Sequence, residues 1–326
     1  MLDNTVVAWL PPALRCIQKD GANLQIPIFP QGGLPFLNLY KRTVVDFTFA
    51  ADNKDREKSK ETGMIDLQNT KGFICDMDGV LYHGNRLLPG AGEFISWLQR
   101  EKKEFLFLTN NSGSTPRELQ QKLKRMGLEV SQEHFYTSAL ATAAFLKEQA
   151  PGCSAYVIGE AGLLNALYDA GITMNDVNPD YVVIGEGRAY SLDTLTKAVN
   201  LVMKGARLIG ANSDVSGPVE QGIAPACRAL TAPVEIATGK QAYFCGKPNP
   251  LMMRSGLNLL GCHSAEAVMI GDRMDTDIIS GMESGMATIL VLSGVSTRDT
   301  VKTYAYQPTV ILDGVGDIPR LAEQAC

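Results

Sequence analysis

The chain has 326 residues, of which 45% are hydrophobic and 20% are charged, and its formal net charge is −5 at pH 7. This length suggests about two domains with a sizeable buried core, and the composition excludes a disordered or fibrous chain. Nucleic acids and anionic membranes attract proteins with a dense basic surface, so the acidic balance argues against both as partners.

Cysteine usage and hydropathy indicate the compartment. The seven cysteines include no C-x-x-C pair, so the sequence predicts neither a disulfide framework nor a zinc ribbon. No apolar run approaches the roughly 18 residues of a membrane span. The first residues also lack the basic region of a signal peptide. We therefore expect a soluble protein of the cytoplasm.

Residues 1–63 differ in composition from the rest of the chain. A stretch punctuated by Pro and Gly, at 27–36, leads into the charge run DNKDREKSKE at 52–61. We expect a poorly ordered N-terminal extension here. It is either a regulatory or docking segment, a dispensable tail, or an upstream reading of a gene whose true start is Met64.

From residue 72 onward, short apolar runs alternate with helical patterns, which is typical of a parallel sheet connected by helices. Strands are expected at 72–75 and 104–109, with a helix at 91–103 between them. The next helix is predicted to begin at a capping box formed by Thr115 and Glu118. Gly127 is expected to end it.

The middle of the chain, 150–240, repeats this alternation and is predicted to form a second α/β domain. The first domain then resumes, so that it comprises 64–149 and 241–326. Strands of the second domain are expected at 155–158, 181–184 and 207–210, with helices at 160–170 and 192–204. After the boundary we expect strands at 242–245, 267–270 and 288–292, with helices at 249–260 and 276–284.

Polar side chains follow four of the strands assigned to the first domain. In open α/β sheets, ligands bind at the carboxyl ends of the strands, so these residues are the candidate site. They are Asp76 and Asp78 after the first strand, Thr109 and Asn110 after the second, Lys247 after the third, and Asp272, Asp275 and Asp277 after the fourth.

Carboxylates gathered at one edge of a sheet repel one another, so a cation must hold them together. Oxygen ligands of this type suit Mg²⁺, which prefers one or two carboxylates together with phosphate and water. Lys247 adds a fixed positive charge. A carboxylate nucleophile, a divalent cation, a lysine and hydroxyl or amide donors together indicate phosphoryl transfer.

The motifs ICDMDGVL, LTNNS, GKPNP and IGDRMDTDI occur in this order. With them, the chain from about 64 to 318 resembles the haloacid dehalogenase-like (HAD) phosphatases. The resemblance is to the class IIA branch with a large α/β cap, which includes the NagD-type nucleotide monophosphatases, and it extends into YVIGEAGLLNALYDAGI and VNPDYVVIGEGRAY of the middle segment. It implies an α/β fold, with a Rossmann-like parallel-sheet core and an inserted α/β cap domain of the type found in that branch.

The resemblance also implies roles for the candidate residues. Asp76 would be the nucleophile that forms an aspartyl-phosphate, and Asp78 the acid that protonates the leaving oxygen and then activates water. Thr109 and the neighbouring Asn110 amide would bind the phosphoryl oxygens. Lys247 would neutralise charge between Asp76 and the phosphate.

The metal site follows from the same resemblance. Mg²⁺ would be bound by the Asp76 carboxylate, the Asp78 backbone carbonyl and Asp272, and Asp277 would hold a metal-bound water. Asp275 is expected to be a helix N-terminal residue only. Taken singly, each of these residues is also compatible with an ordinary turn, cap or surface role. It is their joint occurrence at four strand ends that favours catalysis.

The leading hypothesis is a phosphomonoesterase for nucleoside 5′-monophosphates such as UMP, with a small phosphorylated metabolite as its partner. Alternative substrates are phosphoglycolate, sugar phosphates and pyridoxal phosphate, because cap loops change substrates without changing the core. An alternative of another class is a phosphate-binding regulator without turnover. In the cap, 211–230 is the expected substrate loop. There Arg228 departs from the small residue expected from the resemblance, and it is either a substrate contact or a surface residue of a helix.

Overall fold

A computed structural model of the chain describes residues 65–188, 190–219 and 222–324. The N-terminal extension expected at 1–63 lies outside the described residues. Among the helices that are described, none has both the length and the apolar character needed to cross a membrane.

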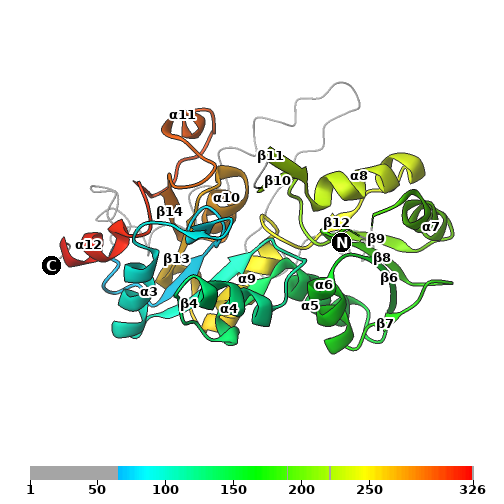
Figure 1. Ribbon diagram of the computed structural model, residues 1–326, viewed down its shortest axis with the longest axis horizontal. Helices are drawn as coiled ribbons and strands as arrows, with labels where there is room; N and C mark the ends of the chain where they lie inside the picture. Colours follow the sequence, from blue (N-terminus) through cyan, green and yellow to red (C-terminus); the bar gives the residue numbers. More distant parts are fainter. Residues whose placement is uncertain (1–64, 189, 220–221, 325–326) are drawn as a thin grey trace, which may run out of the picture. The chain divides into compact units, whose positions relative to one another are not determined.

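Six parallel strands form the core sheet: β1 (Gly72–Cys75), β4 (Glu104–Thr109), β5 (Phe135–Thr137), β13 (Ala267–Gly271), β14 (Ala287–Val291) and β15 (Val310–Leu312). Their order is β15-β14-β13-β1-β4-β5. Figure 1 labels β14, β13 and β4 of this sheet. After β1 the chain therefore adds β4 and β5 on one side, and it later returns to add β13, β14 and β15 on the other. Ligands of open α/β sheets bind at such a reversal, beyond the carboxyl ends of the strands.

Both faces of the core sheet are covered. Neighbouring residues along each strand point to opposite sides of the sheet, and both sets are buried. Phe73 and Phe107 belong to one buried cluster, whereas Ile74 and Leu108 belong to another. The first cluster includes residues of α3 (Ala91–Arg100), α4 (Pro116–Arg125) and α12 (Asp317–Gln324), and the second includes residues of α5 (Ser138–Gln149) and α9 (Pro250–Leu260).

A second sheet is inserted in the chain between α5 and α9. Its parallel strands are β6 (Ser154–Ile158), β7 (Thr173–Met174), β8 (Tyr181–Ile184), β9 (Arg207–Gly210) and β12 (Tyr243–Phe244), in the order β12-β9-β8-β6-β7. Residues of α6 (Ala161–Asp169) pack on one face, and residues of α7 (Leu192–Met203) and α8 (Cys227–Thr238) on the other. This arrangement confirms the predicted fold class, a parallel α/β core with an inserted α/β cap.

One strand belongs to a different sheet from the one expected. The apolar run at 242–245 was expected to resume the core, but β12 pairs with β9 of the cap. The pairing continues past the strand, since the Cys245 and Gly246 amides donate to the carbonyls of Gly210 and Ala211 at 3.1 and 2.8 Å. An apolar run predicts a buried strand but does not show which strand it pairs with, so the sequence pattern could not distinguish the two sheets.

Smaller elements complete the chain. The helix expected at 276–284 begins as one wide π turn over Met274–Ile278, which contains Asp275. The remaining elements are α10 (Ile279–Glu283), α11 (Arg298–Val301), the hairpin β2 (Tyr82–His83) and β3 (Arg86–Leu87), and the cap hairpin β10 (Ser216–Val219) and β11 (Gly222–Pro225).

The start of α4 confirms the predicted capping box. The Thr115 hydroxyl accepts a hydrogen bond from the Glu118 amide at 3.2 Å, and the Glu118 carboxylate accepts one from the Thr115 amide at 2.8 Å. Gly127 follows the helix with a φ of +89°, a conformation that favours glycine. These contacts fix where α4 begins and ends, and therefore where the loop from β4 must run.

We expect Thr115→Ala to lower the free energy of unfolding by about 1 kcal/mol, because a backbone amide of the first turn loses its acceptor. Chemical denaturation measures this change. Arg117→Ala, at an exposed position of the same turn, is the control and should change stability by less than about 0.5 kcal/mol. Equal stability of Thr115→Ala and the wild type would contradict the role given to the cap.

Candidate active site

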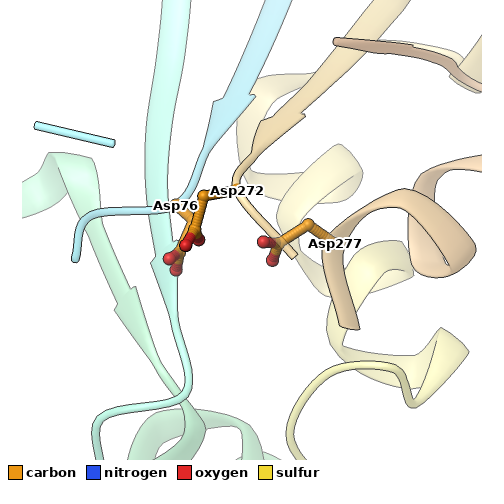
Figure 2. A group of neighbouring side chains, drawn as sticks. All are labelled: Asp76, Asp272 and Asp277. Carbon is orange, nitrogen blue, oxygen red and sulfur yellow. The ribbon is translucent and has the colours of Figure 1, made fainter. Parts of the chain in front are cut away.

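Three carboxylates meet at the carboxyl end of the core sheet. Asp76 follows β1 and Asp272 follows β13, which are neighbouring strands, and Asp277 lies in the turn after β13. Figure 2 shows them facing one another. One oxygen of each carboxylate lies within 4.8 Å of the others. The topology thus brings together residues that are about 200 positions apart in sequence, as the strand-end argument predicts.

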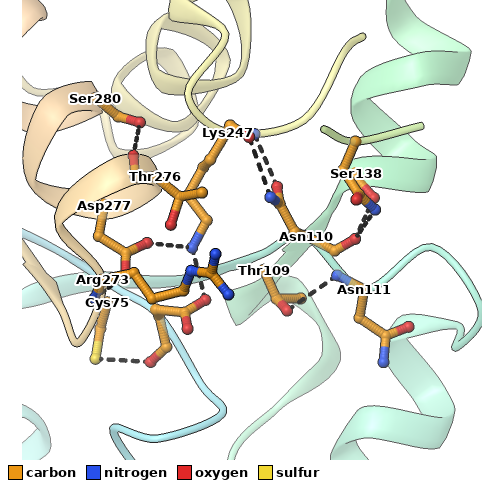
Figure 3. A network of polar contacts seen from close by, with 12 residues as sticks. Cys75, Thr109, Asn110, Asn111, Ser138, Lys247, Arg273, Thr276, Asp277 and Ser280 are labelled. Atoms are coloured by element: carbon orange, nitrogen blue, oxygen red, sulfur yellow. Dashed lines mark hydrogen bonds and ion pairs between the residues drawn. The ribbon is translucent and has the colours of Figure 1, made fainter. Parts of the chain in front are cut away.

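Lys247 lies among these carboxylates. Its ammonium group donates to Asp277 Oδ1 at 2.7 Å (Figure 3) and to Asp76 Oδ1 at 2.6 Å. The side chain is only 2% exposed. An ammonium has three donors, so one remains for a further acceptor in the site. Lys247 therefore stabilises two acids and keeps one donor for a ligand.

The electrostatics of the cluster leave negative charge in excess. Burial raises the pKa of the Asp76 carboxyl to about 7, although Lys247 opposes the shift. Burial also raises the pKa of Asp272 well above its usual value, and the charges of Asp277 and Asp76 add to the effect. Burial alone would lower the pKa of Lys247, but the two carboxylates raise it instead. One lysine does not balance three acids, so the cluster favours a further cation.

Asp272 offers the clearest opening for a metal ion. Its Oδ2 accepts from the Val295 amide at 2.7 Å, whereas its buried Oδ1 has no hydrogen-bond partner among the described residues. A Cβ on Gly79 or Gly294 would lie 2.5 or 2.0 Å from Oδ2, so only glycine fits beside this carboxylate. A buried, unpartnered carboxylate oxygen beside Asp76 is a donor set that fits Mg²⁺.

Asp277 is held differently. Its Oδ1 is paired with Lys247, and its Oδ2 accepts from the Arg273 amide at 3.1 Å. Both oxygens of Asp277 thus already have a partner, whereas Asp272 keeps one oxygen without any. The outer position of Asp277 stays a prediction. Asp275 forms a two-point ion pair with the Arg273 side chain at 3.0 and 3.1 Å, outside the cluster.

Asp78 projects toward the cavity, and its side chain is 48% exposed. His83 Nδ1 lies 3.8 Å from its Oδ1. Burial raises the pKa of Asp78, and the nearby Lys122 and His83 oppose the rise. A carboxyl group that reaches solvent and carries a raised pKa is suited to giving and taking a proton.

The loop after β4 carries the predicted phosphate-binding residues. Thr109 Oγ1 accepts from the Asn111 amide at 3.2 Å, so its own proton is free to be donated. The side chain of Asn110 is engaged elsewhere: its Oδ1 accepts from the Lys247 amide at 2.7 Å, and its Nδ2 donates to the Lys247 carbonyl at 3.1 Å. The Asn110 side chain thus holds the main chain of Lys247, and its main-chain amide is the group predicted to bind phosphate.

A cavity of about 1270 Å³ opens above these residues, lined by both sheets' loops and by the β10–β11 hairpin. Among its described lining residues, Tyr82 and His83 carry the only aromatic rings. The polar and charged side chains with which the cap lines it are Glu160, Glu186, Arg188, Asp214 and Ser216, and the other cap residues of the lining are glycines and apolar residues. The cap's side of the cavity therefore offers carboxylate acceptors and one guanidinium, and no aromatic platform among the residues described.

Arg228 lies elsewhere. Its guanidinium forms an ion pair with Glu235 on the next turns of α8 and lies 4.9 Å over the ring of Phe244. It is not one of the residues that line the cavity. Of the two roles considered for Arg228, substrate contact and surface residue of a helix, these contacts favour the second.

Two residues of the site were missed in the sequence. Glu186 follows β8 with one residue between, and Asn212 stands in the same relation to β9. Glu186 lies within hydrogen-bond distance of Ser112 and Asn212, and Asn212 within that of Asn110. The signal that identified Asp76 and Asp272, a polar side chain at the end of a parallel strand, would have found both if it had been applied to the cap.

Comparison with known proteins agrees with this geometry. A family model described as haloacid dehalogenase-like hydrolase matches residues 73–173, and one described as HAD-hydrolase-like matches 244–318. Dihydroxyacetone phosphatase of Corynebacterium glutamicum is 48% identical over 76% of this chain and 90% of its own length. The ribonucleotide monophosphatase NagD of Escherichia coli is 43% identical over 76% of this chain and 98% of its own.

Other relatives are phosphatases with different named substrates. An acid sugar phosphatase of Staphylococcus saprophyticus is 37% identical over 79% of this chain and all of its own length. The solved structure of E. coli NagD superposes with a TM-score of 0.73 at 42% identity, covering 76% of this chain and 98% of that one. A 4-nitrophenylphosphatase from Thermotoga maritima superposes with a TM-score of 0.76 at 30% identity, covering 79% and 99%. The chain therefore belongs to the haloacid dehalogenase-like hydrolases, as a NagD-like phosphatase.

Proposed function

We propose that this phosphatase is a Mg²⁺-dependent phosphomonoesterase that works through an aspartyl-phosphate on phosphate esters of a hydroxylated carbon skeleton. The observation that carries the proposal is the buried cluster in which Lys247 pairs with Asp76 while Asp272 keeps an unpartnered oxygen. Asp76 would attack phosphorus, and Asp78 would protonate the leaving oxygen. Asp78 would then take a proton from the water that hydrolyses the intermediate.

The phosphoryl group would be held by donors already in place. These are the Thr109 hydroxyl, the main-chain amide of Asn110 and the remaining proton of Lys247. Mg²⁺, bound by Asp76, the Asp78 carbonyl and Asp272, would neutralise the phosphoryl oxygens when present. The free state of the five described cysteines suits the reducing cytoplasm in which we place this activity.

The substrate class follows from the cap side of the cavity. Carboxylates such as Glu160 and Asp214 accept hydrogen bonds from hydroxyls, whereas a nucleobase alone would need a stacking ring. The relatives are named as phosphatases of dihydroxyacetone, ribonucleotides and sugars, compounds that share a hydroxylated carbon skeleton. Nucleoside 5′-monophosphates such as UMP stay within the class through their ribose, and small sugar phosphates are the second candidate.

A substrate panel tests this class. Phosphate release from UMP, dihydroxyacetone phosphate and sugar phosphates should exceed release from phosphoglycolate and pyridoxal phosphate by roughly tenfold or more in kcat/KM. Preference for phosphoglycolate would contradict the argument from the cap carboxylates. Phosphate binding without release from any substrate would support a regulatory binding protein in place of an enzyme.

Asp76→Asn should reduce phosphate release by at least about 1000-fold, because an amide cannot form the aspartyl-phosphate. The fold should be retained, since the substitution is close to isosteric and relieves repulsion among the three acids. Circular dichroism and a phosphate-release assay measure both. Asp299→Asn, the same change at a position that is 91% exposed, should keep full activity. Near-equal activity of both variants would exclude Asp76 as the nucleophile.

The Asp272 opening predicts the metal requirement. EDTA should abolish activity, and added Mg²⁺ should restore it. Gly294→Ala should raise the Mg²⁺ concentration for half-maximal activity by roughly tenfold, because its Cβ displaces Asp272. Gly314→Ala, whose Cβ would meet nothing within 4 Å, is the control. A Mg²⁺ dependence unchanged by Gly294→Ala would contradict the place of Asp272 in the metal site.

A further inference from the structure

Glu186 of the cap holds the loop that follows β4 of the core. Its Oε2 accepts from the Ser112 amide at 3.1 Å and from the Ser112 hydroxyl. The Glu186 amide donates back to Ser112 Oγ at 2.9 Å. Ser112 is fully buried, so this two-way contact is shielded from competing water.

Asn212 connects the same carboxylate to the phosphate-binding loop. Its Nδ2 donates to Glu186 Oε1 at 2.6 Å and to the Asn110 carbonyl at 2.6 Å. Asn212 is also fully buried, and it follows β9, the strand beside β8 in the cap. The ends of two cap strands therefore meet one core loop through a single carboxylate.

From Asn110 the contacts continue to the reacting group. The Asn110 side chain forms hydrogen bonds with both the amide and the carbonyl of Lys247 (Figure 3), and the Lys247 ammonium pairs with Asp76. Glu186 is thus connected by hydrogen bonds to the main chain that carries the catalytic lysine.

The packing around these contacts leaves little room for adjustment. A Cβ on Gly185 would lie 2.7 Å from Ser112 Oγ. A Cβ on Gly246 would lie 2.6 Å from Asn110 Oδ1 and 2.6 Å from the Cβ of Asn212. Because protein interiors are close-packed, the backbones at Gly185 and Gly246 leave no space for the loop 109–112 to move into.

We propose that Glu186 is a positioning residue for phosphoryl transfer: it fixes the loop 109–112 and, through Asn212 and Asn110, the main chain of Lys247. The inference rests on the proposed function and deepens it. Glu186 Oε2 accepts two donors and Oε1 a third, which only a carboxylate can do, since an amide would set N–H against N–H. The phosphate end of every substrate meets the loop that Glu186 fixes, whatever the leaving group.

Glu186→Gln is the test. It should lower kcat/KM by roughly 10- to 100-fold, by the same factor for UMP, dihydroxyacetone phosphate and a sugar phosphate. The same variant should also bind inorganic phosphate more weakly, so the inhibition constant of phosphate, which has no leaving group, should rise. Glu160→Gln is the matched comparison, because Glu160 also lines the cavity from the cap but accepts from the Arg188 amide. It should leave the inhibition by phosphate unchanged.

A second variant protects the test against misfolding. Ser112→Ala removes one of the donors to Glu186 and should show a smaller loss that is again equal across substrates. The double variant should lose less than the product of the single losses, because both changes act on one contact. If Glu186→Gln is less stable than the wild type, all four proteins of this cycle can be compared at one lower temperature.

Two results would overturn the inference. One is wild-type behaviour of Glu186→Gln. The other is a loss that differs more than about fivefold among substrates while phosphate inhibition is unchanged, which would make Glu186 a contact of the leaving group. Failure of the proposed function is distinguishable, because the wild type itself would then release no phosphate. In that case, calorimetric titration with inorganic phosphate and Mg²⁺ would still compare the phosphate affinity of the wild type with that of Glu186→Gln.

Discussion

The ion pairs of Lys247 are the interaction on which the site depends. Removing charged groups from water costs several kcal/mol for each ion, and only close pairing offsets this cost. Lys247 is paired on two sides, with Asp76 and Asp277. Loss of Lys247 would leave two buried carboxylates without a countercharge, and an unpaired buried charge typically destabilises a protein by about 3–5 kcal/mol. The local backbone reflects this constraint, since a Cβ on Gly271 would lie 2.2 Å from Asp277.

The core of the site could be predicted from sequence because parallel strands end at a common edge. Once β1, β4 and β13 are recognised as buried strands, the residues that follow them must lie near one another, and this places Asp76, Thr109 and Asp272 together. The same reasoning placed Lys247 correctly although its strand was assigned to the wrong sheet. Position relative to a strand end is local information, whereas the choice of neighbouring strand is not.

What the sequence could not show is how the cap meets the core. Periodicity reveals that β8 and β9 are strands, but it does not reveal which core loop their ends approach, so Glu186 and Asn212 were missed. Arg228 illustrates a second limit, because a lone charge on a helix has many possible partners. Glu235 lies seven residues further, on the same helix face, and this spacing could have favoured the pairing observed.

The position of β12 means that the cap is not a removable module. Lys247 stands three residues after the last residue of a strand that is hydrogen-bonded into the cap sheet. A cut of the chain before β12 would separate the cap sheet from its own edge strand, whereas a cut after Gly246 would keep β12 and its hydrogen bonds to β9 and Ala211 with the cap. An exchanged cap would therefore keep its complete sheet only if β12 travelled with it.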